Sequence, residues 1–146
     1  MLLTKDSTNK ILRHNRWFSR LEQIFIDTHT NLASYISEDS RLPQFKFQKN
    51  DNENFFNIEN YGITLRFTFL MTLNDGTTKG QFFVHQTKPK FGIIDKLIGA
   101  FDFDANGTTN FKISETSGEL VQLPYMGLEI MSHYFLLALK AEETPV

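Results

Sequence analysis

The sequence has no cysteine, no long apolar run and little net charge. Without cysteine the chain can form no disulfide, no thiolate metal site and no cysteine nucleophile. A net charge of −2 gives no overall field that would attract the protein to nucleic acid or to an anionic membrane. These absences exclude a disulfide framework and the electrostatics of a general nucleic-acid binder.

Segments for export or membrane insertion are also missing. No stretch reaches the roughly 18 consecutive apolar residues that span a bilayer. The start, MLLTKDSTNK, lacks the apolar run and small-residue cleavage site of a signal peptide. We therefore expect a soluble, cytoplasmic protein whose residues 1–146 form a single domain, long enough to bury a core without staples.

Motifs that dictate a reaction are absent as well. The glycines form neither a GxGxxG pattern nor a Walker A loop, and there is no GxSxG serine elbow. We expect no bound cofactor, and the sequence favours a role other than catalysis.

Phenylalanine, in contrast, is abundant, with 15 residues against one tryptophan and four tyrosines. The simpler interpretation is a phenylalanine-rich core between a sheet and helices. The alternative is that some of these rings line a binding face, because aromatic residues are enriched at interfaces.

Residues 61–88 contain two alternating segments separated by Asp75-Gly76. From Ile63 to Leu73 the odd positions are apolar and the even positions mostly polar, which is typical of a strand with one buried face. Asp-Gly suits the two central positions of a type I′ turn. A two-residue loop then predicts three cross-strand pairs: Phe69 with Phe82, Phe67 with Val84, and Arg66 with His85.

Periodicity predicts the remaining elements. Apolar residues at three- and four-residue spacing indicate a long helix over residues 8–37 and a second helix over residues 124–140. The same spacing predicts a short helix at 92–98, although a buried strand also fits so short an apolar run. Alternating segments predict short strands at 45–48, 55–58, 101–104, 110–113 and 119–123.

This order of elements is that of an α+β domain. We predict an antiparallel sheet of four to six strands, with the N-terminal helix and the apolar C-terminal helix packed on one face. A cone-shaped sheet curved around the helices is the main variant. The pairing of the strands between residues 45 and 58 does not follow from periodicity.

The segment around Gly107 supports two interpretations. Asp102, Asp104, Asn106 and Gly107 match the first half of an EF-hand calcium loop, which needs oxygen ligands at positions 1, 3 and 5 and glycine at position 6. Position 12, which requires glutamate, is Ile113. A hairpin that sets Phe103 opposite Phe111 is therefore favoured, and no metal site is expected.

Cationic and imidazole side chains provide the other site candidates. The N-terminal helix carries a basic cluster, which we interpret as a solvated face: Lys10, Arg13, His14, Arg16 and Arg20. In the predicted hairpin, Arg66 and His85 are cross-strand neighbours on the face away from the core. If the sheet curls there, His85 could serve as a general base and Arg66 as an anion clamp.

The C-terminal helix is apolar around almost its whole circumference, so it must be covered almost all round. Either the N-terminal helix and the sheet cover it, or another chain does. A homodimer joined through this helix would explain its apolar surface and is compatible with either of the two functions considered below. The residues expected at such an interface are Tyr125, Leu128, Met131, Tyr134 and Phe135.

Two functions remain open. The first is a non-enzymatic protein-binding module, such as a small inhibitor or immunity-type protein. The alternative is a pocket protein, either a small-molecule binder or an enzyme, that uses the Arg66/His85 face.

Overall fold

The computed structural model describes residues 5–39, 45–60, 62–74, 77–88, 93–112, 120–123, 125 and 127–143. Within them, two helices flank one antiparallel sheet whose seven strands pair in chain order. The elements are α1 Lys5–Glu38, β1 Phe45–Gln48, β2 Phe55–Asn60, β3 Ile63–Asn74, β4 Thr77–Lys88, β5 Ile93–Phe103, β6 Thr108–Lys112, β7 Leu120–Gln122 and α2 Gly127–Glu143.

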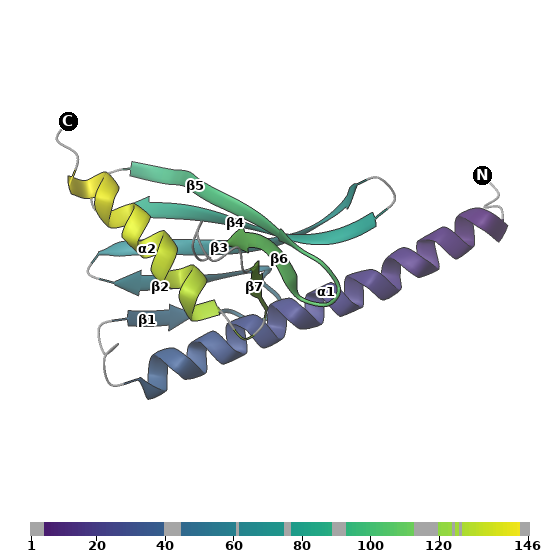
Figure 1. Ribbon diagram of the computed structural model, residues 1–146, viewed down its shortest axis with the longest axis horizontal. Helices are drawn as coiled ribbons and strands as arrows, with labels where there is room; N and C mark the ends of the chain where they lie inside the picture. Colours follow the sequence, from purple (N-terminus) through teal and green to yellow (C-terminus); the bar gives the residue numbers. More distant parts are fainter. Residues whose placement is uncertain are drawn as a thin grey trace.

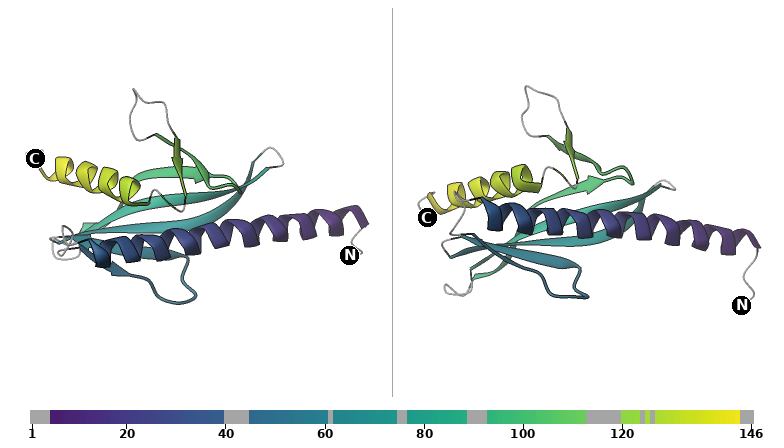
Figure 2. Two further views of the ribbon diagram at one scale, coloured as in Figure 1. Left: turned by 60° about the horizontal axis from the view of Figure 1, so that its bottom comes forward. Right: turned by 90° about the horizontal axis from the view of Figure 1, so that it is seen from below.

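Both helices lie on the same side of the curled sheet (Figures 1 and 2). The α+β class is therefore confirmed. The predicted number of four to six strands is wrong, because the short strands before the central hairpin and those after it all join one sheet of seven.

The central hairpin has the predicted register. Asn74 pairs with Thr77, so β3 and β4 are joined by two residues, although Asp75 and Gly76 themselves lie outside the described part. Along the ladder, Phe69 pairs with Phe82, Phe67 with Val84, and Arg66 with His85. Burial alternates from Ile63 to Leu70 and from Gly80 to Thr87, and this fixes the register because a one-residue slip would turn the buried apolar side chains outward.

The short helix predicted at residues 92–98 is wrong, since residues 93–98 belong to β5 and residue 92 lies outside the described part. Strand β5 carries extra residues relative to β4: Val84 pairs with Gly99, whereas His85 pairs with Leu97, which leaves Ile98 without an opposite residue. Such a β-bulge interrupts the two-residue alternation. The adjacent apolar pairs in this segment imitate helical spacing for that reason.

The second hairpin forms with a different register. Phe103 pairs with Thr109 rather than with Phe111, a displacement of two residues that leaves each side chain on its expected face. The turn is shorter because Gly107 adopts a φ of 82° and its N–H donates to the Asp104 carbonyl. A Cβ at position 107 would also strike the carbonyl oxygen of Leu123.

Helix α1 is a single continuous helix of 34 residues. Helix α2 packs beside α1 and against β5, where a Cβ on Gly99 would lie 2.8 Å from the hydroxyl oxygen of Tyr134. This close approach buries the phenol, and burial raises the pKa of Tyr134 to about 12.

The core lies between the helices and the concave face of the sheet, and eight phenylalanines are buried in it. Phe56 stacks on Phe67 at a ring-centroid distance of 5.0 Å, and Phe25 stacks on Phe69 at 5.1 Å. The abundant phenylalanines thus mainly build the interior. In the described residues, no helix combines the length and apolar character needed to cross a membrane.

Candidate functional site

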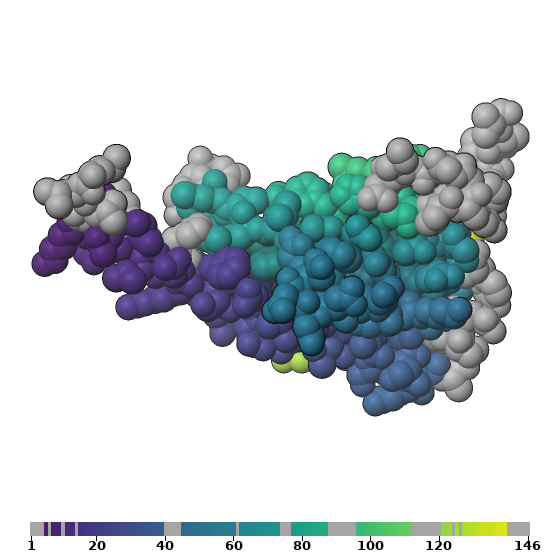
Figure 3. All heavy atoms as spheres, turned by 180° about the vertical axis from the view of Figure 1, so that it is seen from behind, coloured from purple at the N-terminus to yellow at the C-terminus, as the bar shows by residue number. Residues whose placement is uncertain are grey.

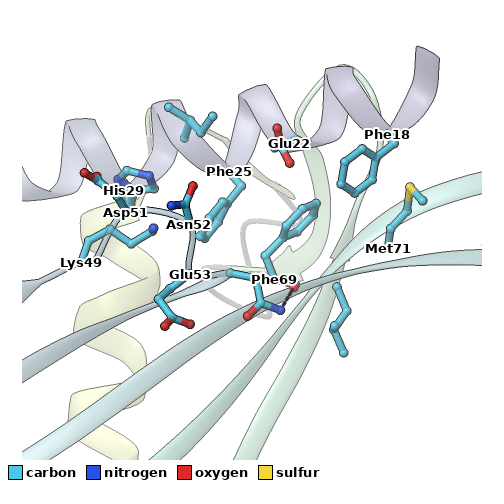
Figure 4. Close-up of a pocket in the computed structure, with 13 residues that line it drawn as sticks. Phe18, Glu22, Phe25, His29, Lys49, Asp51, Asn52, Glu53, Phe69 and Met71 are labelled. Carbon is cyan, nitrogen blue, oxygen red and sulfur yellow. Dashed lines mark hydrogen bonds between the residues drawn. The ribbon is translucent and has the colours of Figure 1, made fainter. Parts of the chain in front are cut away.

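An open groove runs between α1 and the part of the sheet where β2 has ended and β3 continues (Figure 4). We call it the α1–β3 groove, and its volume is about 810 Å³. The lining residues come from α1, the β1–β2 loop and β3: Phe18, Glu22, Phe25, Ile26, His29, Lys49, Asp51, Asn52, Glu53, Asn54, Phe69, Leu70 and Met71.

The apolar part of the groove is formed by two elements. Phe18 and Ile26 of α1 leave 38% and 39% of their surfaces exposed, although both lie beside the buried stripe of the helix. Phe18 points from α1 toward Met71 of β3 (Figure 4). Phe25 and Phe69, stacked on each other and almost fully buried, form the floor.

The groove exists because β2 stops early. Strand β2 has six residues and β3 has twelve, and their ladder ends where Phe55 pairs with Thr68. Asn54 then occupies both backbone groups of Phe69: its carbonyl accepts from the Phe69 N–H at 2.7 Å, and its side-chain amide donates to the Phe69 carbonyl at 2.9 Å. In this way Asn54 ends the ladder and turns the chain away from β3.

The loop that leads into Asn54 is a tight polar turn. Glu53 N–H donates to the Asn50 carbonyl at 3.3 Å, and Asn52 has a φ of 70°, a left-handed conformation that asparagine tolerates better than most residues. The run Lys49 to Asn54 is rich in polar turn residues for this reason.

Charge in the groove is mainly negative. Glu22, Asp51 and Glu53 contribute carboxylates, and Lys49 contributes an ammonium group that lies 5.8 Å from the ring centroid of Phe25. Burial lowers the pKa of His29 from its ordinary value of 6.5, and the positive charge of Lys49 lowers it further, against an opposing effect of Asp27. His29 is therefore neutral near pH 7, and the lining carries two net negative charges.

The Arg66/His85 pair lies on the opposite face of the sheet, as expected for the even positions of β3. The Arg66 Nε donates to the Asn57 side-chain oxygen at 3.1 Å, and its guanidinium stacks over the Phe55 ring at 4.2 Å. Arg66 thus has structural partners on β2, and both it and His85 are half-buried. Neither residue lines the α1–β3 groove.

The residues of the calcium-loop pattern do not point at a common centre. Asp102 accepts a hydrogen bond from the Gln81 side chain at 2.8 Å, whereas the Asp104 carboxylate accepts from the backbone N–H groups of Asn106 and Thr108. These contacts are those of a hairpin turn. Among the described residues, no three histidine, aspartate or glutamate side chains gather as metal ligands would.

The five residues expected at an interface on the C-terminal helix fall into two groups. Met131, Tyr134 and Phe135 are buried in the core of the chain, and Leu128 is partly buried against it, whereas Tyr125 leaves 71% of its surface exposed. A partner that contacts α2 would instead meet a surface containing Leu136, Leu137 and Leu139.

The basic cluster lies on the first half of α1. Arg13 and Arg16 are exposed there, and Arg20 donates from its Nε to the Ala105 carbonyl at 2.9 Å. The side chains of Lys10 and His14 lie outside the described part. Residues 1–20 hold five basic residues and one acidic residue, which leaves the rest of the chain with ten basic and sixteen acidic residues.

Inspection of the sequence alone did not reveal the α1–β3 groove. The one available signal was the unequal length of the segments: a short alternating run before a polar cluster, followed by a run about twice as long. Comparisons with protein-family models, with curated proteins and with solved structures find no significant match for this chain.

Proposed function

We propose that this chain is a non-enzymatic protein-binding module, such as a small inhibitor or immunity-type protein, which receives a segment of its partner in the α1–β3 groove. The observation that carries this proposal is the exposure of apolar side chains from α1 and β3 around an open groove. Phe18 and Ile26 leave 38% and 39% of their surfaces in water, and Met71 of β3 is only partly buried. Exposed apolar side chains gathered in one concavity mark interaction sites more often than isolated ones do.

The first half of α1 supports the same proposal. From Lys5 to Arg20 no described side chain is buried, and Leu21 is the first residue fully inside the core. These four turns extend about 24 Å, at 1.5 Å per residue, and their N-terminal part stands away from the sheet (Figures 1 and 3). A helix of this length is marginal in water on its own, so a partner that covers Ile11, Trp17 and Phe18 would stabilise it.

The lining of the groove resembles a protein interface more than a small-molecule site. It is open along one side and combines an aromatic floor with a charged rim, as interface cores and rims do. The concave interior of the sheet is filled by aromatic rings. A cavity there, lined by residues such as Phe67 and Phe101, has a volume of only about 10 Å³, about the minimum for one water.

The alternative function, a pocket on the Arg66/His85 face, has weaker support. Arg66 is held by Asn57 and Phe55, and the face it occupies is the outer face of the sheet. These contacts occupy one of the five N–H donors of Arg66 and one face of its guanidinium.

Site-specific photo-crosslinking tests the protein-binding function. Replacing Phe18 with benzoylphenylalanine in the full chain should yield a crosslinked protein of discrete mass after irradiation in an extract of the source cells. Leu97 on β5, which is 54% exposed and distant from the groove, provides the control position and should give no such product. Equal crosslinking at both positions, or none at position 18, would contradict the proposal.

A further inference from the structure

The edge of β3 that faces the α1–β3 groove is an open hydrogen-bonding edge. Both the N–H and the C=O of Phe69 point toward Asn54, on the side where β2 lies. Backbone groups alternate in direction along a strand, so those of Met71 and Leu73 point to the same side. The two-residue hairpin agrees, because its closing pair, Asn74 with Thr77, directs the even residues toward β4.

Nothing in the described part of the chain pairs with this edge. The β2–β3 ladder ends at Thr68, and Asn54 satisfies Phe69 alone. Beyond Phe69, four backbone groups of β3 face the space that a longer β2 would occupy. They are the N–H and C=O of Met71 and of Leu73.

This edge is also unprotected. Proteins usually blunt exposed strand edges with charged residues, proline or bulges. Residues 69–73 read FLMTL and contain none of these. Strand β5 also has a long free edge beyond its pairing with β6, but that edge carries the exposed Lys96 and the bulge at Ile98. Of these two open edges, only that of β3 has neither a charged residue nor a bulge that would hinder pairing with another strand.

We infer that the α1–β3 groove binds its partner by strand addition: an extended segment, apolar at alternate residues and carrying lysine or arginine, pairs with Met71 and Leu73 of β3. This inference specifies how the proposed protein-binding function works and rests on it. Backbone hydrogen bonds give such complexes their affinity, and pockets for alternate side chains give them specificity.

The surroundings of the edge determine the chemistry of the segment. Side chains that point toward α1 meet Phe18 and Met71, which requires apolar residues at every second position (Figure 4). Near the β1–β2 loop the segment meets Asp51 and Glu53, with Glu22 above on α1. Three carboxylates against the single ammonium of Lys49 favour a basic segment over an acidic one.

A displayed library of short random peptides is the probe for this inference. Selection against the wild-type chain should enrich peptides with alternating apolar residues and at least one lysine or arginine, and their affinity should fall as salt screens the carboxylates. Enrichment of peptides with helical apolar spacing, or without basic residues, would overturn it.

Two substitutions separate backbone pairing from side-chain contact. Met71→Pro removes an N–H that faces the groove, so it should leave the β3–β4 ladder intact and weaken peptide binding by about tenfold or more, the equivalent of about 1.4 kcal/mol. Met71→Ala keeps the N–H and should weaken binding less. A folded Met71→Pro variant that binds as well as Met71→Ala would refute strand addition.

A second measurement does not depend on the folding of any variant. N-methylation of the selected peptide, one amide at a time, should abolish binding at every second residue and have little effect at the residues between. A pattern without this alternation would overturn strand addition.

The substitution Phe18→Glu distinguishes the two levels of the proposal. If it abolishes peptide binding while N-methylation shows no alternation, the groove binds protein segments in another way and only strand addition fails. If no peptide is enriched, or if Phe18→Glu leaves binding unchanged, the protein-binding function of the groove fails as well.

Discussion

Phe25 and Phe18 lie two turns apart on α1, and their substitution by alanine should have very different effects on stability. Phe25 leaves only 4% of its surface exposed, and its ring lies 5.1 Å from that of Phe69 and 5.8 Å from that of Phe82. Alanine at position 25 would open a cavity among rigid rings that cannot collapse into it. Such Phe→Ala changes cost about 3–5 kcal/mol.

Phe18 provides the matched control. Complete burial of a phenylalanine contributes about 1.5–3 kcal/mol. Phe18 leaves 38% of its surface exposed, so it retains a little under two thirds of that contribution. Alanine recovers about 0.5 kcal/mol through its higher helix propensity. We therefore expect Phe18→Ala to cost about 0.5–1.5 kcal/mol.

Urea unfolding followed by circular dichroism measures both effects. With an m-value of about 2 kcal/mol/M, the loss at Phe25 should lower the midpoint by about 2 M, and the loss at Phe18 by well under 1 M. Equal shifts for the two variants, or a loss below about 1 kcal/mol for Phe25→Ala, would refute the placement of α1 on the sheet.

Three further outcomes are expected. Gly99→Ala should lower the free energy of unfolding by about 1–3 kcal/mol, because its Cβ would push against Tyr134; an unchanged melting temperature would contradict that contact. Burial lowers the pKa of His29 in the folded state, so the unfolded chain takes up the proton at a higher pH and the free energy of unfolding should fall as the pH drops below 6.5. In urea titrations at several pH values, His29→Gln should show a shallower fall of this free energy than the wild type. Equal dependence on pH in the two proteins would count against the prediction. If α2 joins two copies of the chain, light scattering should give a molar mass of twice 17.0 kDa, and Leu136→Glu should reduce it to that of the monomer. A monomeric wild type would exclude the homodimer.

Local patterns determined much of this fold. Alternation from Ile63 to Leu73 and the two-residue loop were enough to fix the β3–β4 register, because a slip would expose a whole apolar face. Apolar residues at three- and four-residue spacing likewise predicted α1 to within a few residues at each end. The predicted range was 8–37, and the observed helix is Lys5–Glu38.

Where periodicity failed, a local irregularity was the cause. The extra residue at Ile98 breaks alternation in β5 and imitates a helix. The left-handed backbone at Gly107 shortens the second turn by two residues, a choice that the apolar pattern does not distinguish because both registers keep the same faces inward.

The sequence by itself determined which faces of the strands and helices are apolar, because side-chain direction follows from residue spacing alone. Only the tertiary structure decided where those faces remain uncovered. Phe18 and Met71 are 53 positions apart, and they come together because Asn54 ends the β2–β3 ladder while β3 continues. Periodicity records which way a side chain points but not which strand lies beside it, so an open edge such as that of Met71 and Leu73 becomes visible only when the sheet is assembled.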